Sequence, residues 1–248
     1  MSTKIKLVNL CKEFDDKWVT KDLNLEIPAK QMTVIIGRSG EGKSVLLKQI
    51  IGLIKPTSGE IIVDDVNIVS LSHQERDEQL SHFGYVFQFA ALLDSLTVYE
   101  NIGITLIEKG VPRKMVDSIV REKLSLVNLS EDNLHKYPSE LSGGMKKRVG
   151  LARTLVTNPT VILYDEPTTG LDPITSRVIH ELMYKMQKTL DVTSVVISHD
   201  LESFKYADNI ALLHKGKIHY FGPAKTIWEC ENPYIYQFIR GLDEGPIQ

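Results

Sequence analysis

Short runs of β-branched and other apolar residues recur along the chain, and segments with helical spacing separate several of them. Most runs are continuous rather than alternating, which is typical of strands that are buried on both faces of a parallel sheet. The pattern therefore predicts an α/β fold, with strands at residues 33–36, 85–87, 161–164, 194–197 and 210–213.

The first part of the chain follows a different pattern. Apolar positions at residues 5–8, 23–27 and 61–63 surround polar turns and predict half-buried strands. We expect these strands to form a small antiparallel arm.

Between about residues 90 and 157 the pattern predicts helices and no strong strand. Gly110-Val111-Pro112, Tyr137-Pro138 and Asn158-Pro159 punctuate this stretch. We interpret it as a helical lobe inserted into a single domain that covers residues 1–248. The sheet core and its arm would then take residues 1–89 and 158–248, and the helical lobe residues 90–157.

The composition is that of an ordinary folded protein. Its 248 residues, 42% hydrophobic and 25% charged, suffice for a sizeable core. A net charge of −3 argues against a broad nucleic-acid-binding surface. Two cysteines, Cys11 and Cys230, rule out a disulfide framework or a thiolate metal cluster. No signal peptide or apolar stretch of about 20 residues is visible, so we expect a cytosolic chain.

A glycine-rich motif follows the strand expected at residues 33–36. Gly37-Arg38-Ser39-Gly40-Glu41-Gly42-Lys43-Ser44 fits the pattern G-x-x-x-x-G-K-[ST], and an apolar helix is expected over residues 45–53. Glycines let backbone amides approach a phosphate, and the helix start adds further N–H groups and a positive dipole end. We expect Lys43 to reach the outer phosphates and the Ser44 hydroxyl to bind Mg²⁺. The motif therefore predicts nucleotide binding.

Polar residues at the ends of two other predicted strands are candidates for catalysis. Asp165 and Glu166 follow residues 161–164; we expect Asp165 near Mg²⁺ and Glu166 to polarise the water that attacks the γ-phosphate. His199 follows residues 194–197 and would donate to the γ-phosphate or orient the water. The remaining histidines lack such a setting and are expected at the surface: His73, His82, His135, His180, His214 and His219.

A second helix start has features of an anion site. Leu141-Ser142-Gly143-Gly144-Met145 opens a predicted helix in which Ser142 is a good N-cap. Gly143 and Gly144 leave the first amides uncovered, so this terminus could also bind a phosphate. By itself, the turn is weak evidence, because such a turn is usually an ordinary cap.

The order of these motifs resembles that of the ATPase subunits of ABC transporters, and the resemblance runs the length of the chain. It implies a P-loop NTPase fold with a RecA-like, mostly parallel sheet core, an antiparallel β arm and an inserted helical subdomain. It also implies ATP and Mg²⁺ as ligands and ATP hydrolysis as the activity. Two subunits would form a head-to-tail dimer, with ATP between Gly37–Ser44 of one and Ser142–Gly144 of the other.

The resemblance also implies individual roles. Phe14 would stack on adenine, Gln88 would sense Mg²⁺ and the attacking water, and Asp172 would communicate across the dimer. Ordinary packing for Phe14 and a strand-end position for Gln88 remain alternatives. The catalytic set is Lys43, Gln88, Glu166 and His199, and the metal set is Ser44, Gln88 and Asp165. The nucleotide-binding set is Phe14, Gly37, Ser39, Gly40, Gly42, Lys43, Ser44, Val45, Ser142, Gly143, Gly144 and Asp172.

Several segments are similar to one branch of that family, the Mce/Mla-type lipid-transport ATPases: residues 44–48, 87–102, 168–174 and 237–247. Met145 replaces the glutamine usual in the family and is also similar to this branch. The resemblance implies two copies driving a permease dimer at the cytoplasmic face of the inner membrane. An Mce-domain substrate-binding protein and a small regulatory subunit would complete a machine that moves phospholipid across the bacterial envelope, with no nucleic acid as partner.

Two surface interpretations and three rival functions stay open. Residues 90–93 would line a groove for a permease helix, or pack in the core. Lys146–Arg148 with Arg153 could face anionic headgroups, although a solvated helix face is preferred. The rivals are an ABC ATPase for lipoprotein release or small-solute import, a soluble switch acting on ribosomes or DNA, and a regulatory module without turnover. A single set of motifs argues against the switch, and Glu166 and His199 argue against the regulatory module.

Overall fold

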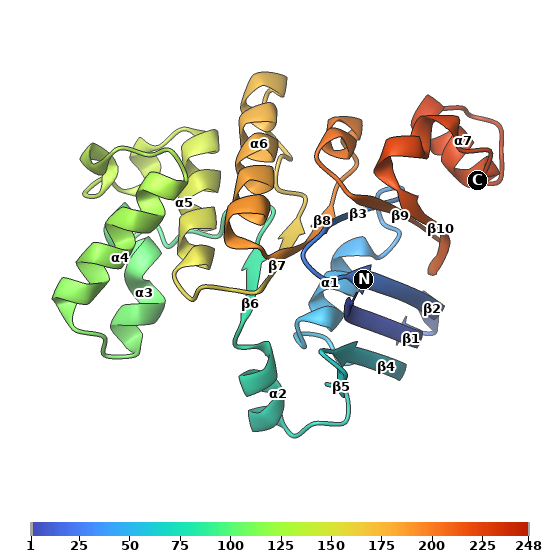
Figure 1. The fold of residues 1–248 in the computed structure, drawn as a ribbon, viewed down its shortest axis with the longest axis horizontal. Helices are drawn as coiled ribbons and strands as arrows, with labels where there is room; N and C mark the ends of the chain where they lie inside the picture. Colours follow the sequence, from blue (N-terminus) through green and yellow to red (C-terminus); the bar gives the residue numbers. More distant parts are fainter. Residues whose placement is uncertain (1, 248) are drawn as a thin grey trace. The chain divides into compact units, whose positions relative to one another are not determined.

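The computed structural model describes residues 2–247 and divides the chain into two compact units. Unit 1 comprises the chain up to Ser81 together with the chain from Val192 onward, and unit 2 comprises His82–Asp191 (Figure 1). The predicted boundaries of the helical lobe, at residues 90 and 157, stay a prediction.

The antiparallel sheet of unit 1 is the arm that the sequence predicts. Ile5 of β1 lies opposite Ile27 of β2 and Val63 of β4, and all three side chains are fully buried. Asp15 and Asp16 adopt left-handed φ angles of 45° and 59° in the tight turn between β1 and β2. The strand order is β2-β1-β4-β5, with β1 at Thr3–Phe14, β2 at Lys17–Pro28, β4 at Ser58–Val63 and β5 at Val66–Asn67.

Unit 1 also contains a mostly parallel set of strands, with the order β10-β9-β3-β8. β3 (Met32–Ile36) pairs in parallel with both β8 (Thr193–Ile197) and β9 (Asn209–His214). Every residue of β3 and β8 is buried, which explains their mostly apolar, non-alternating sequences. β10 (Lys217–Pro223) joins β9 as an antiparallel edge strand that the sequence pattern did not reveal, because Lys217 and His219 interrupt its apolar residues and it ends in Gly-Pro.

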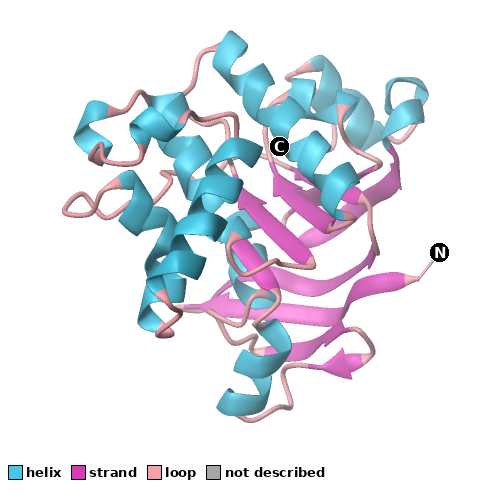
Figure 2. Cartoon of the chain, turned by 60° about the vertical axis from the view of Figure 1, so that its left-hand side comes forward, coloured by secondary structure: helices cyan, strands magenta, loops and turns pink. Residues whose placement is uncertain are grey.

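The α-helices of unit 1 are short, with 8 residues each. Figure 2 shows the helices and strands of the chain in separate colours. The helix expected over residues 45–53 begins earlier, at Lys43, and ends at Ile50, because Gly52 adopts a left-handed φ of 74°. The helices are α1 (Lys43–Ile50), α2 (His73–Leu80) and α7 (Pro233–Arg240), with 3₁₀ helices η3 (Leu201–Lys205) and η4 (Ala224–Glu229).

Unit 2 combines one parallel strand pair with a group of helices. Val116, Val120 and Leu124 recur every four residues of α4 and are buried, so one face of this helix packs against its neighbours α3 and α5 (Figure 1). The strands are β6 (Phe83–Val86) and β7 (Val161–Asp165), and the 3₁₀ helices are η1 (Glu131–Asn133) and η2 (Pro138–Glu140). The α-helices are α3 (Val98–Glu108), α4 (Arg113–Leu126), α5 (Gly143–Leu155) and α6 (Pro173–Leu190).

The fold is therefore α/β, with mostly parallel core strands, an antiparallel sheet and helices between β6 and β7. Over residues 2–247, no helix combines the length and the apolar character that crossing a bilayer requires.

Candidate functional site

The glycine-rich loop connects β3 to α1 and folds around a lysine. Lys43 is only 4% exposed, and its Nζ donates hydrogen bonds of 2.8 Å to the carbonyl oxygens of Gly37 and Arg38. Gly42 adopts a left-handed φ of 88°, and a Cβ there would lie 2.3 Å from Cγ1 of Val19. Only glycine fits this turn without strain, so the backbone itself sets the position of the lysine.

The same loop leads into the start of α1. None of the described side chains caps this helix, whose N-cap is Gly42. Ser39 and Gly40 are exposed, while Ser44 and Val45 are half-buried. Backbone amides at a helix start, together with a lysine, form an arrangement suited to phosphate.

Glu41 ties this loop to the end of β9. Its Oε1 lies 2.8 Å from Nδ1 of His214, and its Oε2 accepts a hydrogen bond of 2.6 Å from the backbone N–H of Lys215. The ring of His214 is nearly completely buried beside the rings of His219 and Tyr234. The glycine-rich loop is therefore fixed both by the contacts of Glu41 with the end of β9 and by the hydrogen bonds of Lys43 within the loop.

Two histidines correct the sequence interpretation. His214 and His180 are 3% and 2% exposed, so the expectation that they lie at the surface is wrong. Glu41 and His214 are separated by 173 positions in the chain, and only the fold brings them together.

Asp165 lies at the carboxyl end of β7 and is buried. Asp165 is 7% exposed, and its Oδ2 accepts a hydrogen bond of 2.8 Å from the hydroxyl of Tyr85 on β6. Burial and the neighbouring carboxylate raise the pKa of Tyr85 well above its ordinary value, so the phenol stays protonated and keeps donating. Tyr85 therefore fixes the orientation of Asp165, a role that no sequence signal indicated.

Glu166 and Gln88 meet in unit 2. The side-chain amide of Gln88 donates to Oε2 of Glu166 at 3.3 Å, and the hydroxyl of Thr169 donates to the same oxygen at 2.9 Å. Glu166 adopts a left-handed φ of 47°, which is strained for a residue other than glycine. The structure thus brings together two residues that the sequence analysis selected and adds Thr169, which it missed.

Ser142 caps α5, as the sequence predicts. Its hydroxyl accepts a hydrogen bond of 3.3 Å from the backbone N–H of Met145, and Ser142 and Gly143 are exposed. Gly144 is buried, and a Cβ there would lie 2.5 Å from Cγ2 of Thr175. The start of α5 therefore presents its backbone outward.

Asp172 caps α6 through several hydrogen bonds. Its Oδ1 accepts hydrogen bonds of 3.0 Å from the backbone N–H groups of Ile174 and Thr175. Its Oδ2 accepts from the Thr175 hydroxyl, and these bonds hold the pKa of Asp172 below its ordinary value. The cap explains the local role of this residue, while its role across a dimer stays a prediction.

The remaining candidates are accessible in unit 1. Phe14, at the end of β1, is 42% exposed, and the ammonium of Lys12 lies 4.5 Å from the centre of its ring. His199 follows β8 and is exposed. Both side chains can therefore reach a ligand.

The oxygen donors present fit Mg²⁺. Among residues 2–247, no group of three or more His, Cys, Asp or Glu side chains could hold a metal by itself. Mg²⁺ commonly binds through one or two protein oxygens and takes its other ligands from nucleotide phosphates and water. The Asp165 carboxylate, oriented by Tyr85, and the Ser44 hydroxyl are donors of this kind.

Comparison with known proteins connects these features to transport ATPases. Residues 20–169 match the family model described as ABC transporter. Over its whole length the chain is 38% identical to a protein of Mycobacterium tuberculosis named probable ribonucleotide transport ATP-binding protein mkl, of which it covers 69%. It is 35% identical to the intermembrane phospholipid transport system ATP-binding protein MlaF of Haemophilus influenzae, over 98% of this chain and 93% of that protein. It is also 42% identical to the methionine import ATP-binding protein MetN of Corynebacterium jeikeium, over 80% of this chain and 54% of that protein.

Solved structures give the same result. A dimeric ATP-binding cassette in a post-hydrolysis state, bound to ADP and Pi, has a TM-score of 0.81 and 32% identity, covering 89% of this chain and 98% of that one. The protein cbiO1 of Clostridium perfringens, part of the ABC transporter complex cbiONQ, has a TM-score of 0.85 and 29% identity, covering 97% and 96% of the two chains.

Proposed function

Because the chain belongs to the family of ABC transporter ATP-binding subunits, we propose that the ATP it hydrolyses drives an Mce/Mla-type lipid-transport permease. The observation that carries this proposal is the match to MlaF, which covers 98% of this chain and 93% of that protein. The match to mkl covers 69% of its partner, and the match to MetN covers 54%. The similar length of the two chains supports the lipid-transport proposal, although the identity to mkl, at 38%, and to MetN, at 42%, is higher than the 35% to MlaF.

In this proposal, unit 1 binds the nucleotide. Lys43 and the amides of Gly37–Ser44 bind the β- and γ-phosphates, and Phe14 stacks on the adenine. Ser44, Asp165 and Gln88 are the proposed protein ligands of Mg²⁺; when bound, the ion would neutralise charge on the phosphates. The buried hydrogen bond from Tyr85 keeps Asp165 in the orientation that this task needs.

Glu166 is the proposed general base. A carboxylate with one oxygen engaged by Gln88 and Thr169 is held in place while it accepts a proton from water. The Gln88 amide can also orient that water, and His199 donates a hydrogen bond to the γ-phosphate. These groups supply positioning and charge stabilisation, which dominate catalysis of phosphoryl transfer.

The dimer is the second part of the proposal. A second copy would supply Ser142, Gly143 and Gly144 to the nucleotide bound by the first, and Asp172 would lie at the contact. The exposed start of α5 and the solved dimers of similar cassettes support this arrangement. Each of the two nucleotide sites would then be formed by residues from both copies of the chain.

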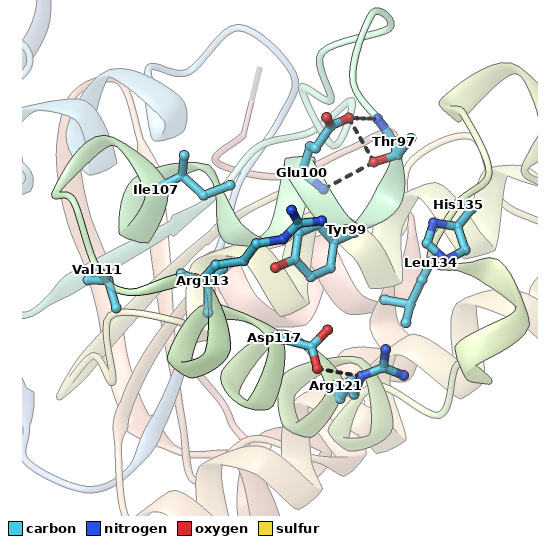
Figure 3. A pocket seen from close by; sticks show the side chains of 11 residues that line it. Thr97, Tyr99, Glu100, Ile107, Val111, Arg113, Asp117, Arg121, Leu134 and His135 are labelled. Atoms are coloured by element: carbon cyan, nitrogen blue, oxygen red, sulfur yellow. Dashed lines mark hydrogen bonds and ion pairs between the residues drawn. The ribbon is translucent and has the colours of Figure 1, made fainter.

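A cavity of about 570 Å³ in unit 2 is our candidate for the surface that binds the permease (Figure 3). Ile107 and Val111 provide apolar surface at one end, and Tyr99 and Arg113 lie at the centre of the view. Asp117 and Arg121 line the cavity from α4, joined by a hydrogen bond of 2.9 Å. The mixture of apolar and charged side chains suits an amphipathic helix with charges of both signs, which we propose to be a cytoplasmic helix of the permease.

The expectation that residues 90–93 contact a permease concerns a different part of unit 2. They are not among the residues that line this cavity. Leu93 is exposed, whereas Ala90 is buried at 3%. Their contact with a permease therefore stays a prediction.

The proposed catalytic roles can be tested with three purified proteins. The parent should hydrolyse ATP, Lys43→Ala should bind ATP weakly, and Glu166→Gln should bind ATP normally but turn it over at least about a hundredfold more slowly. Hydrolysis by Glu166→Gln at the parental rate would show that another group is the base.

The substrate needs a separate experiment. The tagged chain is purified from its native membrane, and the co-purifying proteins and lipids are identified by mass spectrometry. A permease with an Mce-domain protein and bound phospholipid is the expected result. A permease with a methionine- or ribonucleotide-binding partner would replace the lipid proposal and leave the ATPase assignment intact.

A further inference from the structure

A strained loop follows β6 and carries Gln88. Ala90 and Ala91 both adopt left-handed φ angles, 59° and 47°, although neither is glycine. Such a conformation costs roughly 1 kcal/mol per residue and persists only where surrounding contacts hold it.

Two cations of α5 supply contacts to this loop. The ammonium of Lys147 donates to the carbonyl oxygen of Gln88. The guanidinium of Arg153 donates to the carbonyl oxygens of Ala91 at 2.7 Å and Ala90 at 2.8 Å. Three carbonyls of residues 88–91 are therefore bound by side chains of the helix that begins with Ser142-Gly143-Gly144.

These cations are not the solvated helix face that the sequence suggested. Lys147 is only 8% exposed, and burial lowers the pKa values of both Lys147 and Arg153. A buried cation is unfavourable without partners. The carbonyl oxygens of residues 88–91 supply those partners to Lys147 and Arg153. The interpretation of Lys146–Arg148 and Arg153 as a solvated face is therefore wrong for Lys147 and for Arg153.

The helix also touches the loop directly. A Cβ at Gly150 would lie 3.1 Å from the carbonyl oxygen of Ala90 and 3.4 Å from its Cα. Glycine at this position lets the helix approach closely enough for Lys147 and Arg153 to reach the loop on either side.

Asn101 of α3 holds the following part of the loop. Its Oδ1 accepts a hydrogen bond of 2.8 Å from the backbone N–H of Leu93. Its Nδ2 donates to the carbonyl oxygens of Leu93, Leu96 and Thr97 at 2.9 to 3.0 Å. The loop that carries Gln88 is thus fixed to two helices, α5 and α3.

We propose that Lys147 and Arg153 are positioning residues for ATP hydrolysis. By binding the carbonyl oxygens of residues 88–91 they hold the backbone that aims the Gln88 amide at Glu166. The inference rests on the roles proposed above for Gln88 and Glu166. It adds that the helix beginning at Ser142 sets the position of the Gln88 amide through two cations, the buried Lys147 and the half-buried Arg153.

The test compares Lys147→Met with Lys146→Met. Lys146 is the neighbouring lysine, half-exposed, and serves as the matched control. Methionine has a similar length but no N–H groups, so we expect Lys147→Met to lower kcat about tenfold while the KM for ATP changes less than about twofold, a split that indicates lost alignment. Lys147→Arg, which restores donors, should recover most of kcat, and Lys146→Met should match the parent.

Gly150→Ala provides an independent perturbation. It leaves both cations in place but pushes a methyl group against Ala90, so it should lower kcat in the same way. Hydrogen exchange followed by mass spectrometry should show faster exchange in the peptide covering residues 88–97 for Lys147→Met and unchanged exchange in the remaining peptides.

The outcomes separate the two proposals. Two results for Lys147→Met would overturn the positioning role: a parental kcat, or a lower nucleotide affinity together with a lower melting temperature. Either result would leave the ATPase mechanism standing. If Glu166→Gln hydrolyses ATP at the parental rate, the proposed mechanism fails first. In that case faster exchange at residues 88–97 in Lys147→Met would still support the loop contacts.

Discussion

The contact between Glu41 and His214 gives a quantitative prediction for the phosphate loop. His214→Phe removes the Nδ1 group that faces Glu41 and keeps an aromatic ring to pack beside His219 and Tyr234. A carboxylate only accepts hydrogen bonds, so Nδ1 of His214 must be the donor in this contact. After the substitution, Glu41 retains the backbone N–H of Lys215 as its partner in this contact.

The size of the effect follows from burial. The side chains of His214 and Glu41 are 4% and 15% exposed, so water screens their interaction weakly. A hydrogen bond to a charged group contributes about 1.5 to 3 kcal/mol when it is shielded in this way. We therefore expect His214→Phe to lower the free energy of unfolding of unit 1 by about 2 kcal/mol.

The assay is urea unfolding followed by tryptophan fluorescence. Both tryptophans of the sequence, Trp18 and Trp228, lie in unit 1, so the signal reports on that unit. A double-mutant cycle with Glu41→Leu isolates the interaction, and we expect a coupling free energy of about 1 to 2 kcal/mol. Additive effects, within about 0.5 kcal/mol, would refute the reasoning that the pair acts as a unit.

Three further predictions concern other parts of the chain. Asn101→Leu should destabilise unit 2 by about 3 kcal/mol, because four hydrogen bonds of a fully buried side chain are lost, and urea unfolding followed by circular dichroism checks this. Burial lowers the pKa of His219 from its ordinary value of 6.5, so as pH falls the unfolded chain takes up a proton before the folded chain does. The free energy of unfolding should therefore fall as pH drops below about 6.5. His219→Gln should weaken this pH dependence, measured as the urea midpoint at several pH values. Phe14→Ala should weaken ATP binding about tenfold while Phe14→Tyr preserves it, as measured by calorimetric titration; equal affinities for the parent and Phe14→Ala would assign the ring to packing.

The sequence predicted the central features of the fold because they depend on local patterns. Strands such as β3 and β8 are buried on both faces, so most of their residues are apolar and do not alternate with exposed positions. The edge strand β10 lacks this pattern, and its pairing with β9 depends on a neighbour rather than on its own composition.

In the candidate site too, features that depend on local sequence could be predicted, and features that depend on distant segments could not. The glycine-rich loop and the acidic end of β7 could be identified because their chemistry requires particular residues at a fixed spacing. Tyr85, Thr169 and the Glu41–His214 contact could not be identified, because each depends on which segments the fold brings together. Lys147 illustrates the reverse error, since a lysine beside other cations suggested a solvated surface, whereas the structure buries it against the carbonyl oxygen of Gln88.

The account depends most on the claim that two copies of the chain share each ATP. The direct measurement is the mass of Glu166→Gln in solution by light scattering, with and without ATP and Mg²⁺, together with the same measurement on a Glu166→Gln, Ser142→Arg double variant. We predict that ATP doubles the mass of the first protein and leaves the second monomeric, because the arginine blocks the exposed start of α5. A Glu166→Gln protein that binds ATP with full affinity and stays monomeric at every concentration tested would contradict the shared site.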